Sequence, residues 1–135
     1  MNVAQQAIHT LGKSERLKSR KQIEQMFQSG KSFHTGFFKV FHQCPETDAV
    51  KPTSCLQFGV AVGTRHFKQA VKRNRIKRLM REAYRLQKQE LELLLQQQHK
   101  TLNLFFIFTG KEVPSYELVF ETTTAALQKL YKLYQ

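Results

Sequence analysis

The sequence has no tryptophan, a single aspartate and only two cysteines among 135 residues. No apolar run approaches the ~20 residues of a membrane-spanning helix, and the first twelve residues lack the apolar core of a signal peptide. Cys44 and Cys55 form no CxxC motif, and the five histidines show no metal-ligand spacing. Two reduced thiols are expected, with a disulfide or a metal pair as the alternative. These absences predict a soluble cytoplasmic protein with no membrane segment, bound metal or cofactor.

Acidic residues are also scarce, with 10 Asp+Glu against 22 Lys+Arg. The single aspartate, Asp48, lies between Pro45 and Pro52 in a segment expected to be a loop. A two-metal nuclease needs clustered carboxylates, and an acid–base nuclease needs a histidine pair or a histidine with a carboxylate. Neither arrangement is apparent, and the chain has no phosphate-binding loop, GxSxG or HExxH motif. We therefore expect no catalytic residues and no small-molecule substrate in this polypeptide.

The chain does contain enough apolar material for one core: 41% of its residues are hydrophobic, including eleven Phe and four Tyr. Residues 1–12 are polar and aperiodic, which predicts a flexible N-terminal tail. Residues 13–135 are expected to form a single domain.

Apolar periodicity predicts the order of the elements. A short helix begins after Ser19 and stops at Gly30, residues 31–43 are extended, and residues 44–54 form a loop. A strand over 56–62 leads into a long helix over about 68–97. The apolar run 102–108 predicts an inner strand, and a turn over 109–115 precedes a closing helix. The apolar side of that helix is predicted to comprise Leu118, Ala125, Ala126, Leu127, Leu130, Tyr131 and Tyr134. This order predicts an α/β (α+β) two-layer sandwich with a small mixed sheet and three main helices.

The positive charge is concentrated in one segment. Residues 65–88 contain ten Lys or Arg and one acid, Glu82, and so carry +9 of the net charge of +12. On a helical projection, one side is apolar: Ile76, Leu79, Met80, Ala83 and Leu86. The opposite side is polar and basic, with Arg73 and Arg75 at its margins: Asn74, Lys77, Arg78, Arg81, Arg85 and Lys88. A solvated surface is the plain alternative, but such helices usually interleave acids with bases, so the pattern favours a polyanionic partner.

Within this helix the segment AVKRNRIKRLMREA, residues 70–83, resembles the "RNR" signature of the protein component of bacterial ribonuclease P. The layout of residues 13–134 is similar as well, from the Arg16–Leu17–Lys18 start through FGVAVGTR to the final helix. The resemblance implies a left-handed βαβ crossover. It also implies that an RNA subunit carries the active site and its Mg²⁺, while this chain binds that RNA and precursor tRNA during removal of the 5′ leader.

The basic segment and the resemblance together indicate the residues expected to bind RNA: Arg65, Lys68, Lys72, Arg73, Asn74, Arg75, Lys77, Arg78, Arg81 and Arg85. The resemblance also implies a cleft for the single-stranded leader. The matching positions are Phe27, Phe37, Lys39 and Phe41, where stacking in a positive groove would hold RNA with little base preference. Core packing is the alternative for Phe27 and Phe37. Ile23 departs from the family, which often has an aromatic residue there.

A second class of function is a basic structural RNA binder, such as a ribosome-associated protein or an RNA chaperone, with no part in cleavage. Composition does not separate the two, and only the motif favours ribonuclease P. A helix-turn-helix DNA binder is less favoured because strands flank the basic helix.

Overall fold

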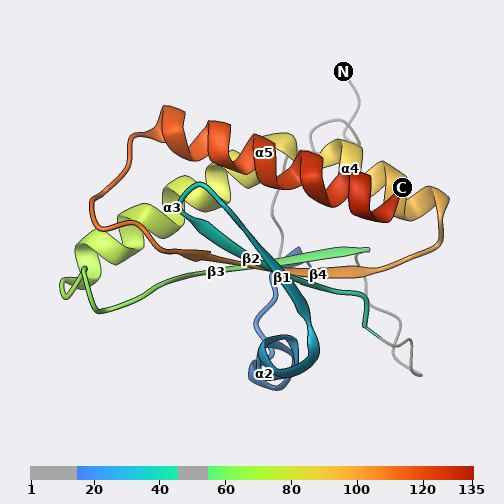
Figure 1. Ribbon diagram of the computed structural model, residues 1–135, viewed down its shortest axis with the longest axis horizontal. Coiled ribbons are helices and arrows are strands. Elements are labelled where there is room, and N and C mark those ends of the chain that lie inside the picture. Colours follow the sequence, from blue (N-terminus) through green and yellow to red (C-terminus); the bar gives the residue numbers. More distant parts are fainter. Residues whose placement is uncertain (1–14, 46–54) are drawn as a thin grey trace.

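The computed structural model describes residues 15–45 and 55–135 (Figure 1). The predicted tail, residues 1–12, and the loop around Asp48 lie outside the described residues. Within the two described ranges, no helix is long and apolar enough to cross a membrane. Helices pack on one mixed sheet, so the predicted α+β class is confirmed.

The sheet has the strand order β1-β2-β4-β3. β1 (Lys31–Thr35) pairs antiparallel with β2 (Phe38–Gln43), which pairs antiparallel with β4 (Leu102–Phe108). β3 (Leu56–Val62) lies parallel to β4, so the helical segment between them is a crossover connection. The prediction that 102–108 is an inner strand is confirmed. The hand of the crossover stays a prediction.

Helices cover both faces of the sheet (Figure 1). α3 (Ala70–Gln87), α4 (Gln89–Gln97) and α5 (Tyr116–Tyr134) lie on one face. α2 (Arg20–Ser29) lies on the other. The two-layer prediction is confirmed for the sheet and α3–α5, and α2 adds a short layer opposite.

Each layer encloses its own apolar cluster. The main core lies between the sheet and α3–α5, with Phe38, Val40 and Phe106 contributed by inner strands. A second core lies under α2 and contains Leu17, Met26, Phe41 and Phe105. Alternate residues of β2 and β4 therefore serve opposite cores, as period-two side-chain alternation requires.

The predicted extended segment 31–43 is a hairpin instead of one strand. Thr35 pairs with Phe38, which leaves only Gly36 and Phe37 in the turn. Gly36 has φ +54°, a left-handed conformation that suits glycine, and a Cβ there would lie 2.9 Å from Thr122 Cγ2 of α5. Because aromatic residues surround this glycine on both sides, the apolar pattern does not reveal the turn.

The predicted helix over 68–97 is divided into α3 and α4 at Lys88. The prediction that Lys88 lies on the exposed basic side is wrong, because its side chain is 1% exposed and pairs with Glu15 and Glu92. A helical projection assumes one straight helix and does not include Glu15, which is distant in sequence. Leu86, predicted to be apolar core, is 40% exposed, whereas Tyr84 is buried and stacks on Phe58 with ring centroids 3.7 Å apart.

The closing helix begins where the sequence predicts, since the Ser115 side chain caps α5 by accepting a hydrogen bond from the Leu118 N–H. Its apolar side differs in part from the prediction. Leu118 and Ala125 are exposed, while Val119 and Thr123 are buried. The Thr123 hydroxyl keeps a hydrogen-bond partner although it is buried, because it donates to the Val119 carbonyl at 2.7 Å.

The last turn of α5 is tied to the sheet by His42 and Tyr134. His42 Nδ1 lies 2.6 Å from the Tyr134 hydroxyl oxygen, within hydrogen-bonding distance. Burial, and then the positive charge of Lys31, lower the pKa of His42. The folded protein therefore disfavours the protonated imidazole.

This shift predicts a pH dependence of stability. The pKa of His42 in the unfolded chain is near its ordinary value of 6.5, above the value in the folded state. The unfolded chain therefore binds more protons, and the contribution of His42 to stability is complete above pH 6.5 and is lost as the pH falls below it. We expect the free energy of unfolding in urea to fall between about pH 7.5 and about pH 5.5, and to fall less in His42→Gln. An equal decrease in both proteins would contradict this assignment.

Candidate nucleic-acid interface

None of the ten predicted RNA-binding side chains is buried. Five of the ten are exposed on α3: Lys72, Asn74, Arg75, Arg78 and Arg81. Arg73, Lys77 and Arg85 are partly exposed on the same helix. Arg65 and Lys68 are exposed in the connection between β3 and α3. The main core immobilises the opposite side of α3 through Ile76, Met80, Ala83 and Tyr84, so the basic side has a fixed orientation.

Four of these side chains share one hollow of about 430 Å³ that α3 forms with Arg16. Its lining consists of Arg16, Asn74, Arg78, Arg81, Glu82 and Arg85. Arg16 and Glu82 were not among the predicted RNA-binding residues. The other six predicted residues do not line this hollow.

The electrostatics of the hollow favour an anion. Four arginines and one glutamate give its lining a net charge of +3. Partial burial, and then the charge of Arg16, lower the pKa of Arg81. The guanidinium of Arg81 nonetheless stays protonated at neutral pH, so it repels the charge of Arg16. A phosphate between them would replace repulsion with two attractive contacts.

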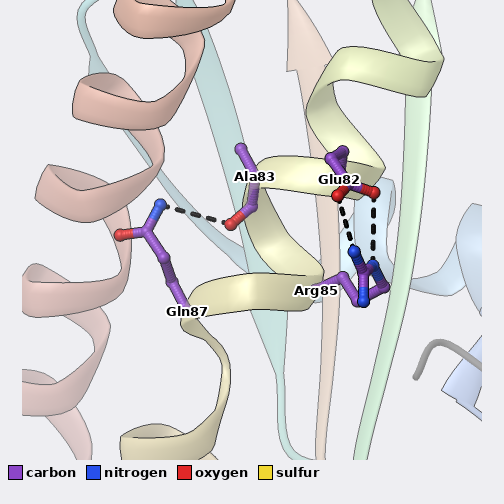
Figure 2. Close-up of polar contacts among 4 residues, drawn as sticks. All are labelled: Glu82, Ala83, Arg85 and Gln87. Carbon is purple, nitrogen blue, oxygen red and sulfur yellow. Dashed lines mark hydrogen bonds and ion pairs between the residues drawn. The ribbon is translucent and has the colours of Figure 1, made fainter. Parts of the chain in front are cut away.

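Glu82 offsets part of this charge by pairing with Arg85 (Figure 2). Arg85 Nη2 lies 2.6 Å from Glu82 Oε1, and Arg85 Nε lies 3.2 Å from Glu82 Oε2. The hydrogen bonds from Arg85 lower the pKa of Glu82. Both side chains are partly exposed, so the pair adds little stability and leaves Arg78 and Arg81 as the more available guanidinium groups.

The C-terminal end of α3 is held against α5 by Gln87. Its amide nitrogen donates to the Ala83 carbonyl at 3.2 Å (Figure 2) and to the Phe120 carbonyl at 3.1 Å. Its amide oxygen accepts a hydrogen bond from the Thr124 hydroxyl. These contacts fix the part of α3 that carries Arg81 and Arg85.

Arg73 has a structural contact that the sequence does not predict. Its Nη1 donates to the backbone carbonyls of Phe67 and Lys68, at 2.7 Å and 2.9 Å. These bonds hold the connection that leads from β3 into α3. The connection carries Arg65 and Lys68, so Arg73 helps to place two of the predicted RNA-binding residues.

A second surface lies on the other side of the sheet, and we call it the α2 face: Phe27, Lys39, Phe41, Phe105 and Ile107. The Phe27 ring centroid lies 4.8 Å from that of Phe41 and 5.5 Å from that of Phe105. Lys39 Nζ lies 5.0 Å from the Phe41 ring centroid. Phe27 is 47% exposed, whereas Phe41 is 9% exposed beneath it. The α2 face thus combines an exposed aromatic ring with a positive charge.

The structure does not place Phe37 with the other three predicted leader-binding residues. It packs against Phe38 and Phe108, with ring centroids 5.1 Å and 5.0 Å away, on the side of the main core. The expectation that Phe37 shares a strand face with Lys39 and Phe41 is therefore wrong. Phe37 lies in the hairpin turn, so period-two alternation begins only after it.

Sequence reasoning missed Phe105, Ile107 and Arg16. The alternation within LNLFFIF was available as a signal, because Phe105 and Ile107 share a strand face. In the register, Phe105 lies opposite Phe41 and Ile107 lies opposite Lys39. Arg16 has no comparable local signal, because its position depends on β3 and α3.

Two further observations concern possible chemistry. Among residues 15–45 and 55–135, no three His, Cys, Asp or Glu side chains come together as a potential metal site. Cys44 and Cys55 are both free thiols, and burial is the main cause that raises the pKa of Cys55. The basic side of α3 presents positive charge, and the α2 face presents an exposed aromatic ring and a lysine.

Comparison with known proteins gives a consistent result. A family model for ribonuclease P matches residues 11–133. The ribonuclease P protein component of Porphyromonas gingivalis is 39% identical over 119 residues, which cover 88% of this chain and 82% of that protein. That of Chlorobium phaeobacteroides is 35% identical over 119 residues, which cover 83% and 82% of the two chains.

Solved structures agree in fold. The RNase P protein from Thermotoga maritima has a TM-score of 0.63 at 27% identity, covering 85% of this chain and 96% of that chain. The Staphylococcus aureus RNase P protein also has a TM-score of 0.63, at 17% identity, covering 90% and 98% of the two chains.

The contacts of Arg73 predict that two neighbouring arginines differ in their effect on stability. Arg73→Ala removes two hydrogen bonds from a charged donor and should lower the free energy of unfolding by about 1–2 kcal/mol. Arg75→Ala removes the same charge from an exposed position and should change it by less than about 0.5 kcal/mol. Urea unfolding of both variants measures the difference. Equal destabilisation would show that Arg73 does not hold the connection.

Proposed function

The chain belongs to the ribonuclease P family of protein components, and from this membership we propose that its two surfaces bind two different RNAs. Ribonuclease P is an endoribonuclease made of RNA and protein, and this chain is its protein subunit. In our proposal the basic side of α3 binds the RNA subunit, while the α2 face binds the 5′ leader of precursor tRNA. Cleavage removes that leader and leaves a mature tRNA 5′ end in the cytoplasm.

The observation that carries the proposal is the basic side of α3. Its arginines are exposed or partly exposed, the helix beneath them is immobilised by the core, and three arginines of the helix share one hollow with Arg16. Folded RNA presents a dense array of phosphates, whose recognition needs correctly spaced positive charge more than base contacts. Arginine suits this task because its planar guanidinium can contact a phosphate through two N–H groups.

In the proposed function, RNA and protein have different roles. The reacting groups and the Mg²⁺ ions belong to the RNA subunit, and this chain supplies binding and orientation. The chemistry of the surfaces supports this division, since they offer cations and aromatic rings. Neutralising backbone phosphates allows the RNA to fold and to bind its substrate at a lower concentration of free Mg²⁺.

The α2 face supports the second part of the proposal. Unpaired bases expose their π-faces, and they stack on aromatic side chains with little regard to sequence. Phe27 presents such a ring, braced from below by Phe41 and Phe105. Lys39, beside Phe41, supplies a positive charge for the leader backbone. Ile23 packs against this cluster from α2 and adds apolar contact without a ring to stack.

The first test uses cleavage. We expect the purified protein alone to leave precursor tRNA intact, and to stimulate cleavage when added to a bacterial ribonuclease P RNA at low Mg²⁺. Arg78→Ala should require on the order of tenfold more protein for the same stimulation, because one phosphate contact is lost. Lys132→Ala, which removes a positive charge from α5, is the control for net charge.

Two results would contradict this function. Cleavage by protein freed of all RNA would place the catalytic groups in the chain. RNA binding without any stimulation of cleavage would instead fit an RNA chaperone.

The second test concerns the leader. Phe27→Ala should weaken the affinity of the assembled enzyme for precursor tRNA by roughly 5- to 150-fold, the cost of one stacking contact, and leave mature tRNA affinity nearly unchanged. Phe27 is a cleaner probe than Phe41, whose truncation would also open a cavity in the second core. Leu93→Ala, at another exposed apolar residue, is the control. Equal weakening of both tRNAs would exclude the α2 face as the leader site.

A further inference from the structure

Lys88 is a buried lysine at the break between α3 and α4. Its Nζ lies 2.6 Å from Glu15 Oε1 and 3.9 Å from Glu92 Oε1, and its side chain is 1% exposed. Burying an ammonium group is costly even when it is paired, and an apolar residue of similar size often stabilises such a position better. The charge at Lys88 therefore indicates a role in addition to packing.

The nearer partner of Lys88 is Glu15. It is the first residue of a short segment, residues 15–17, that runs along the edge of β3. At the other end of this segment the Leu17 N–H donates to the Phe58 carbonyl at 2.9 Å, and the Leu17 side chain is buried in the second core. Gly59 permits the close approach, since a Cβ there would lie 3.1 Å from the Leu17 carbonyl oxygen. Arg16 lies between these two anchors and forms a parallel bridge with Phe58.

The Glu15–Lys88 ion pair and the Leu17–Phe58 hydrogen bond hold Arg16 close to other arginines, which repel it. Arg16 lines the hollow with Arg78 and Arg81, and the pKa of Arg81 is lowered by burial and by the charge of Arg16. A long exposed side chain gains rotamer entropy and screening by moving into solvent. Its backbone must therefore be fixed for Arg16 to remain over α3.

We propose that Lys88 is a positioning residue that, through Glu15, holds Arg16 over α3, so that Arg16, Arg78 and Arg81 form one site for a backbone phosphate of RNA. The proposal rests on the proposed function, in which the basic side of α3 binds the RNA subunit. Lys88 itself contacts no RNA because it is buried. The folded protein already holds Arg16 and Arg81 together against their mutual repulsion. A phosphate can therefore bind between them without rearrangement of the protein.

The sign of one mutational effect separates positioning from general electrostatics. Glu15→Ala raises the net charge from +12 to +13, and long-range attraction alone would then tighten RNA binding. Loss of the ion pair instead releases Arg16, and binding should weaken by about threefold to tenfold. The magnitude of the salt slope of log K should fall by roughly 0.7–0.9, the value for one lost phosphate contact. Ribonuclease P RNA is the probe, titrated at several salt concentrations.

A double-mutant cycle tests whether Glu15 acts through Arg16. Glu15→Ala should weaken binding when Arg16 is present and change it by less than about twofold in an Arg16→Ala protein, because the group it positions is already gone. Thermal unfolding of each variant shows that binding is measured on folded protein. If Glu15→Ala does not fold, Glu15→Gln replaces it, since the amide keeps a hydrogen-bond acceptor while losing the charge.

Glu92→Gln is the matched control. It removes the other carboxylate near Lys88 without touching the segment that carries Arg16, so RNA affinity should stay within about twofold of the wild type. The inference is overturned if Glu15→Ala binds RNA as tightly as wild type or more tightly, or weakens it equally in both Arg16 backgrounds. If Arg78→Ala also has no effect on affinity, the proposed function fails as well. If Arg78→Ala weakens binding while Glu15→Ala does not, only the positioning role fails.

Discussion

The structure depends on the burial of both faces of β4. Six of its seven residues are buried, and it lies between an antiparallel and a parallel neighbour. A strand in this position needs apolar cover on each side. Leu104, Phe106 and Phe108 contribute to the core under α3–α5, while Phe105 contributes to the core under α2. The requirement to cover one strand twice thus places the basic helix and the aromatic α2 face on opposite sides of the sheet (Figure 1).

The core also explains why so much positive charge is tolerated on one helix. α3 buries Ile76, Met80, Ala83 and Tyr84, and this apolar contact holds its arginines close together although few acids separate them. At Arg81 of this helix, burial and then the positive charge of Arg16, which lies outside α3, lower the pKa. Such a surface is stable as part of a folded domain, yet its free energy falls further when a polyanion replaces mobile counterions. The apolar side of α3 thus stabilises the fold, and the side proposed to bind RNA is the opposite one.

Local patterns in the sequence predicted most of the elements, and long-range contacts explain the errors. The apolar pattern located β3 and the apolar run located β4, while Ser19 and Gly30 located the ends of α2. Gly36 was missed because aromatic residues continue through the turn, and that omission also misplaced Phe37. Lys88 was misplaced because its partner Glu15 is 73 residues away. Arg16 was omitted from the candidate interface for the same reason. Its neighbours belong to β3 and α3, which are distant from it in sequence, so no local pattern around Arg16 indicates them.

The proposed function, in which the subunit orients RNA, requires a fixed distance between the two candidate surfaces. Three long-range contacts provide that rigidity. Gln87 joins α3 to α5, His42 joins the sheet to the last turn of α5, and Glu15 joins the edge of β3 to the end of α3. Each connects elements that the apolar cores alone would allow to slide, because apolar contact has no direction. In the proposed function these contacts would keep an RNA on α3 and a leader on the α2 face in a constant relation, so that the protein would bring the cleavage site to the RNA active centre by geometry.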